Sequence, residues 1–256
     1  MTQTDPKTSR GDREEVQMSP NRKTALVAGV FYLLTFVSIP TLFLYGQVKG
    51  ANYIIGAGPD TAAIIGGILE IIVALAGIGT AVALFPVLKR QNEGVALGFV
   101  GSRVLEAATI FAGVAFLLSV VTLRQAGAGA GALVTGQALV ALYDRIFLQG
   151  QSFMPAICDL LLGFLLYKSR LVPRGLSLIG IVGAPLLLAS YLAVMFGLIV
   201  QHAAPATFAA LPVALFEFSL GVWLVVKGFK PSPILSSETR DASAAAATNP
   251  SASRRP

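Results

Sequence analysis

The sequence predicts an all-α integral membrane protein, a bundle of six transmembrane helices. Of its 256 residues, 55% are hydrophobic and only 12% are charged, against roughly 25% charged residues in ordinary soluble domains. Mean hydropathy is +0.74. Too few charges are present to cover the outside of a soluble fold with this much apolar surface, so a water-soluble globular protein is excluded. A third observation, the distribution of Lys and Arg, supports the same fold and is described below.

The first four spans follow from uncharged or nearly uncharged runs, because a bilayer core about 30 Å thick needs ~20 residues of apolar helix. The first run has no charge, the second is interrupted by Glu70, the third contains Arg103 and Glu106, and the fourth contains Asp159. The spans are expected at 25–45, 61–86, 95–122 and 146–167. Residues 132–143, after a glycine-rich hinge, are expected to form a short helix lying on the outer surface.

The last apolar stretch, 175–216, is too long for one span and divides at 201–205, a polar turn that contains a proline. The fifth and sixth spans are therefore expected at 176–200 and 207–226. The three organisational units are a disordered N-terminal tail, a six-helix domain and a disordered C-terminal tail, at residues 1–20, 21–230 and 231–256.

The basic residues predict the orientation. With both termini in the cytoplasm, the inner segments hold fifteen of the 19 Lys and Arg residues, the outer loops hold three, and Arg103 lies within a span. This asymmetry is the positive-inside pattern of an even number of helices. The net charge of +6 is therefore interpreted as basic residues that contact anionic lipid head groups. For this reason nucleic acid is not expected as a partner. The single Cys and single His exclude a Cys/His zinc site within one chain.

Five charged residues lie inside the predicted spans, where each costs about 2.5–3.5 kcal/mol at the centre of the bilayer. At 1.5 Å per residue of helix, all five fall within a few ångströms of the midplane. Small residues at helical spacing surround each acid, which indicates faces that pack against other helices. The sequence therefore predicts a buried polar layer made of Glu70, Arg103, Glu106, Asp159 and Glu217.

This predicted layer is unbalanced, because four carboxyl groups face one guanidinium group. Either several of the acids are protonated, or a cation or a water-filled cavity neutralises them. A functional interpretation is a pathway for protons or small cations, or a cavity for a polar small molecule. The structural alternative is a hydrogen-bonded network that pins the helices together, and the sequence leaves both open.

A weaker signal comes from prolines in the outer halves of the spans, including Pro155, which frees the backbone carbonyl of Gln151. These prolines predict either ordinary helix kinks or an outward-opening vestibule. The side chains expected to line such a vestibule are Gln149, Gln151 and Ser152.

Several stretches resemble a bacterial membrane family catalogued only as domain of unknown function 4386. They are Asn21-Arg-Lys-Thr-Ala-Leu-Val-Ala-Gly29, Arg103-Val-Leu-Glu-Ala107, Leu142-Tyr-Asp144 and Leu162-Gly-Phe-Leu-Leu-Tyr-Lys-Ser-Arg-Leu-Val-Pro-Arg174. The sequence departs from the family pattern at Gln149-Gly-Gln151. The resemblance implies a multi-span protein of the bacterial inner membrane, implies no activity, and directs attention to Arg103, Glu106 and Asp144.

Two classes of function remain. The first is a transporter-like or proton- or cation-responsive protein that uses the buried layer. The second is a non-catalytic scaffold or accessory subunit, as a homo- or hetero-oligomer in the bilayer. An enzyme is the less favoured third, because the spans hold no histidine, no Ser/His/Asp set and no metal-ligand spacing. No cofactor or metal is expected.

Overall fold

The chain folds into an all-α membrane bundle. The computed structural model describes residues 18–201 and 203–236, and the elements of this part are helices. Six of the helical segments are long and apolar enough to cross a membrane. The elements are α1 (Pro20–Leu34), η1 (Thr35–Ser38), α2 (Thr41–Leu44), η2 (Tyr53–Ile55), α3 (Thr61–Leu88), α4 (Glu93–Gln125), η3 (Ala130–Ala132), α5 (Leu133–Leu148), η4 (Gln149–Phe153), α6 (Met154–Ser169), α7 (Arg174–Met195) and α8 (Ala204–Val226).

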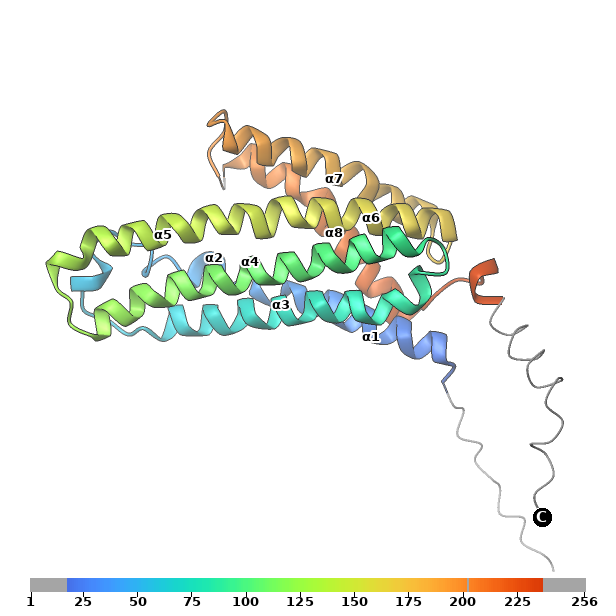
Figure 1. Cartoon of the computed structure of the whole chain (residues 1–256), viewed down its shortest axis with the longest axis horizontal. Helices are drawn as coiled ribbons and strands as arrows, with labels where there is room; N and C mark the ends of the chain where they lie inside the picture. Colours follow the sequence, from blue (N-terminus) through green and yellow to red (C-terminus); the bar gives the residue numbers. More distant parts are fainter. Residues whose placement is uncertain (1–17, 202, 237–256) are drawn as a thin grey trace, which may run out of the picture.

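The long helices form a closed ring in chain order. Helix α1 packs on α3, α3 on α4, α4 on α5 and α6, α6 on α7, α7 on α8, and α8 returns to α1. Figure 1 shows α1 beginning at the same end of the bundle as α8 finishes. We call this the terminal end, and we call the opposite end, which holds residues 46–60, the distal end. The six predicted spans are confirmed as helices long enough to cross a bilayer.

The fourth span is much longer than predicted. Residues Ala130–Ser169 form one continuous helical segment of 40 residues, which is about 60 Å at 1.5 Å per residue. The expectation of a separate surface helix at 132–143 is wrong, since α5 runs in line with α6 (Figure 1). The reason is packing: Leu133, Val140 and Tyr143 join an apolar cluster with α4 and the segment 48–54, so α5 is covered and does not lie flat on a membrane surface.

The first span is interrupted, whereas the sequence predicted a single helix to residue 45. Helix α1 stops at Leu34 and continues as the 3-10 turn η1, then as the short α2. Pro40 has no backbone N–H to donate, so it cannot continue the helical hydrogen bonding. The hydroxyl groups of Thr35 and Thr41 instead donate to backbone carbonyls at 2.7 Å each. The regular α-helix of the first crossing is therefore interrupted between Leu34 and Thr41.

A polar clasp closes the distal end. The Arg124 guanidinium group, at the end of α4, lies 3.0 Å from the Asp60 carboxylate, and Gln125 donates to the same carboxylate at 2.9 Å. The Tyr53 hydroxyl also donates to Asp60. The hydrogen bonds from Tyr53 and Gln125 lower the pKa of Asp60. The clasp thus holds the segment 46–60 against the ends of α3 and α4.

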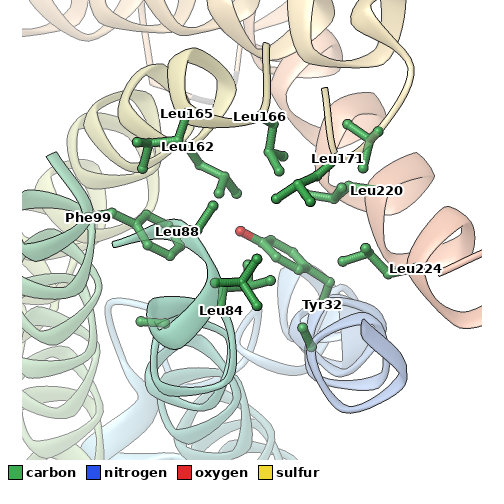
Figure 2. Packing of buried hydrophobic residues seen from close by; sticks show 14 of the residues in the cluster. Tyr32, Leu84, Leu88, Phe99, Leu162, Leu165, Leu166, Leu171, Leu220 and Leu224 are labelled. Atoms are coloured by element: carbon green, nitrogen blue, oxygen red, sulfur yellow. The ribbon is translucent and has the colours of Figure 1, made fainter. Parts of the chain in front are cut away.

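The terminal end contains the main apolar core. Figure 2 shows the ring of Tyr32 surrounded by leucines of α3, α6 and α8. Residues beyond α8 also pack at this end, because the Ser232 hydroxyl donates to the Ser169 carbonyl at 2.5 Å and Leu235 packs on this core. The rest of the predicted tails, 1–17 and 237–256, lies outside the described residues.

Candidate functional site

Arg103 lies about a third of the way along α4 and points into the ring of helices. Its side chain is 1% exposed. One terminal nitrogen lies 3.0 Å from a carboxylate oxygen of Glu106, one helical turn further along α4. The other lies 2.5 Å from Glu217 of α8 and donates to the hydroxyl oxygen of Tyr32 of α1 at 3.2 Å. Arg103 therefore connects α4 to both the first and the last helix of the ring.

Asp159 of α6 completes the group and is the least satisfied member. Its side chain is 0% exposed, and one oxygen lies 3.9 Å from the Arg103 guanidinium group, too far for a hydrogen bond. Neither carboxyl oxygen has a hydrogen-bond partner among the described residues. The neighbouring Cys158 thiol lies 3.5 Å from Glu106. We call Arg103, Glu106, Asp159 and Glu217 the arginine cluster.

A glycine of α3 lies beside the arginine cluster. A Cβ atom built on Gly77 of α3 would stand 4.0 Å from the Arg103 side chain. A larger residue at this position would occupy the space beside the aliphatic part of Arg103. Gly77 lies seven residues after Glu70 on α3, and the structure places it beside Arg103.

The charges of the arginine cluster do not balance. Three carboxyl groups surround one guanidinium group, so full ionisation leaves an excess of two negative charges. An apolar interior does not hold two uncompensated charges. At least one of the carboxyl groups is therefore protonated, or a cation stands beside them.

A cavity of about 270 Å³ reaches the cluster. Arg103, Glu106 and Glu217 form its polar floor, and its walls are mostly apolar side chains of η1, α2, α7 and α8. A second cavity, of about 210 Å³, lies between the α5–η4 segment, α7 and α8 towards the distal end. The two cavities share four lining residues, which are Phe147, Gln151, Leu187 and Ala210. They are therefore adjacent along one side of the bundle.

Glu70 does not join the arginine cluster. It is 1% exposed and accepts hydrogen bonds from Tyr143 at 2.7 Å, from Tyr45 at 3.1 Å and from Gln151 at 3.3 Å. It lies seven residues from Gly77, which is about 10 Å along α3 towards the distal end. The expected single layer is thus two groups, one around Arg103 and one around Glu70.

The other predicted polar residues have different surroundings. Asp144 pairs with Lys49 at 2.7 Å, and Gln149 is exposed. Gln151 lines both cavities and also contacts Glu70. Ser152 lines only the distal cavity of the two. Gln149, Gln151 and Ser152 lie in η4, a π-helical turn, and such turns occur often at functional sites.

Sequence reasoning missed the tyrosines. Tyr32, Tyr45 and Tyr143 are all buried, and each bonds to a charged group of one of the two sites. Tyr143 falls within the predicted surface helix 132–143, and its burial is part of the reason why that prediction is wrong. The sequence did contain a signal for Tyr32, which lies within an apolar span. A buried tyrosine hydroxyl needs a polar partner, so this position predicts a polar group nearby.

Within the part of the chain that the structure describes, no group of three or more His, Cys, Asp or Glu side chains is arranged to hold a metal ion. The carboxyl groups of the arginine cluster are turned towards a guanidinium group and a cavity.

One family model matches residues 27–228, a region that begins within α1 and ends just beyond α8. It is described as a domain of unknown function, DUF4386. No curated protein and no solved structure matches the chain.

Proposed function

The chain belongs to the DUF4386 family, a family of unknown function, and we propose that this member exchanges protons for cations at the arginine cluster. The observation that carries the proposal is the meeting of three carboxyl groups at one arginine, beside a cavity that Arg103, Glu106 and Glu217 line. Ionisable groups inside a membrane protein are costly and commonly mark proton or ion pathways. In the arginine cluster the carboxyl groups outnumber the guanidinium group, so a bound proton or cation would be stabilised there.

The proposed exchange uses Glu217 and Glu106, the two carboxyl groups that line the cavity. With no cation bound, one carboxylate balances Arg103 and protons neutralise the others. A cation in the cavity supplies a second positive charge, so one proton leaves. Asp159, enclosed on the far side of Arg103, is the carboxyl group best placed to stay protonated, because it has no hydrogen-bond donor nearby.

We place the protein in the inner membrane of a bacterium with both termini in the cytoplasm. The support is the excess of Lys and Arg in the segments at the terminal end. The few basic residues of the distal loops include Lys49 and Arg124, and both form ion pairs within the chain. The terminal end then faces the cytoplasm and the distal cavity faces the outside.

The test is a flux assay in liposomes that contain the full chain and a trapped pH-sensitive dye. A gradient of potassium, sodium or choline should change the internal pH in wild type. The change should be lost in Glu217→Gln and in Glu106→Gln. Glu93→Gln is the matched control, since Glu93 begins the same helix as Arg103 but is exposed. Wild-type liposomes that behave like empty ones under every gradient would refute the proposal.

A second candidate function is a membrane scaffold or accessory subunit, and the connectivity of Arg103 favours it. The arginine cluster ties α1, α4, α6 and α8 together, which is also what a purely structural network would do. In that case Glu106→Gln lowers the stability of the bundle and no cation gradient moves protons in wild type. A partner that stays bound through gentle detergent extraction and is lost from Glu106→Gln would support this role.

A further inference from the structure

The cavity above the arginine cluster has one wall made by the interrupted part of the first span. Thr35, Ile39 and Leu42 of the segment 35–42 line this wall, and Ala214 of α8 lies among the residues on the opposite side. Glu217, with Arg103 and Glu106, forms the polar floor of the same cavity. The interruption of the first span near Pro40 therefore lies at the part of the cavity that is bounded by the first span and by α8.

Helices α1 and α8 are in close contact only on the terminal side of this cavity. A Cβ atom on Gly29 would stand 2.8 Å from the carbonyl oxygen of Gly221, so the two backbones touch. The last aromatic contact of this seam is between Phe36 and Phe218, with ring centres 5.4 Å apart. Beyond it, η1 and α2 pack on α3, whereas α8 packs on α7. The two walls of the cavity thus diverge towards the distal end.

The rim of this divergence is apolar and faces outwards. Ile39 is 55% exposed and Leu42 is 61% exposed, although both also line the cavity. Leu211 and Leu215 are exposed on the neighbouring part of α8. In a bundle that spans a bilayer, exposed leucine and isoleucine side chains at this depth contact acyl chains. The mouth of the cavity is therefore on the lipid side.

From these features we infer that the cation bound by the arginine cluster is an organic cation with an apolar body, which enters sideways from the distal leaflet. This inference rests on the proposed function and adds the class of ligand and its route. The carboxyl groups on the floor select a positive head, and the apolar walls select a hydrophobic body. The volume of about 270 Å³ accommodates on the order of ten non-hydrogen atoms, since one water takes ~30 Å³ in the liquid.

The charged and titratable groups that face Glu217 come from three other helices. They are Tyr32 of α1, Arg103 and Glu106 of α4, and Cys158 and Asp159 of α6. Helices α3 and α7 contribute Gly77 and Leu187 near this site. A bound quaternary ammonium ion cannot itself release a proton, so any proton released on binding comes from these groups. Binding of one cation in the cavity is then coupled to the release of one proton from these groups.

The first test is equilibrium binding of radiolabelled benzyltrimethylammonium to the full chain in lipid nanodiscs. We expect binding that strengthens by up to tenfold per pH unit, because one proton is released. Glu217→Gln should abolish the pH dependence and weaken binding by at least tenfold. Tetramethylammonium, which has the head but no apolar body, should compete at least tenfold less well. Neopentylbenzene, the uncharged analogue, should not compete.

The second test follows the route through exchange rates. Leu42→Trp narrows the lipid-side mouth and should slow dissociation of the labelled cation at least fivefold, whereas Leu42→Ala should accelerate it. Position 42 faces outwards, so both variants should fold. Thr207→Trp narrows the distal cavity, which Thr207 lines, and should leave the rate unchanged. Slow exchange in Thr207→Trp with normal exchange in both Leu42 variants would overturn the lateral route.

The two proposals fail in distinguishable ways. Absence of benzyltrimethylammonium binding, with proton flux driven by potassium or sodium still dependent on Glu217, overturns the ligand class and leaves the exchange function standing. Absence of both binding and flux overturns the two together. Binding that does not depend on Glu217 or on pH assigns the cation to another site and refutes the inference.

Discussion

Replacing Arg103 with methionine tests whether the arginine cluster holds the bundle together. Methionine keeps much of the length and volume of arginine but removes the charge and the donors. In the structure Arg103 binds Glu106 at 3.0 Å, Glu217 at 2.5 Å and the Tyr32 hydroxyl at 3.2 Å, and it is 1% exposed. The variant therefore leaves buried carboxyl groups without the one cationic partner that they have among the described residues.

Removing one partner of a buried ion pair costs about 3–5 kcal/mol, because the other charge is left uncompensated. For a chain of this size one kcal/mol shifts Tm by about 2–4 °C. We therefore expect Arg103→Met to lower Tm by roughly 6–20 °C at neutral pH. The loss should shrink as pH falls, because protonated carboxyl groups no longer need the arginine for charge balance.

The measurement is thermal unfolding in detergent micelles at pH 7.5 and pH 5, followed by the fluorescence of Trp223, the single tryptophan. Arg145→Met is the matched control, since Arg145 is exposed on α5 and should change Tm by only a degree or two. Equal Tm values for wild type and Arg103→Met at pH 7.5 would show that Arg103 does not pin the helices. A loss that grows on acidification would contradict the charge-balance argument.

Three further predictions concern other parts of the bundle. Tyr143→Phe removes the 2.7 Å hydrogen bond to Glu70 and should lower the free energy of unfolding by about 1.5–3 kcal/mol, as for bonds to charged groups, with any Glu217-dependent flux unchanged in the same liposome assay. Gly29→Ala places a methyl group 2.8 Å from the α8 backbone, so it should destabilise the bundle by about 1–3 kcal/mol in thermal unfolding. Asp60→Asn tests the distal clasp. The hydrogen bond from Tyr53 is the main cause of the lowered pKa of Asp60, so the ionised carboxylate stabilises the clasp above pH ~4. This stabilisation is lost as pH falls through the lower pKa that Asp60 has in the folded state. Proteolysis of the segment 46–60 should therefore be faster in Asp60→Asn than in wild type at pH 7 and equal in both near pH 2, and equal rates at pH 7 would refute the clasp.

The number and approximate position of the spans followed from the sequence because hydropathy and length are properties of the chain itself. Runs of ~20 apolar residues must cross a bilayer core about 30 Å thick as helices, whatever their neighbours are. The lengths of individual helices were less predictable. Helix α5 carries Gln137, Asp144 and Arg145, and these polar residues predict a surface segment. In the structure α4 packs beside α5 and covers its apolar face.

The composition of the site was only partly predictable for a different reason. Helical rise gives the depth of a residue, with an error of one turn or more from uncertain helix ends. Glu70 was assigned to the midplane by depth alone, yet the packing of α3 places Gly77 beside Arg103 and moves Glu70 towards the distal end. The direction of each side chain around its helix axis depends on helix contacts, which hydropathy does not encode.

By itself, the sequence determined that the chain is a six-span membrane protein with costly charges inside its spans. Only the tertiary structure decided which of those charges meet, that three carboxyl groups share Arg103, and that a cavity opens beside them. The physical reason is that insertion into lipid is set by the composition of each segment, whereas the meeting of side chains requires helices to pack closely. Contacts such as that between Gly29 and Gly221 set this packing across almost the full length of the chain.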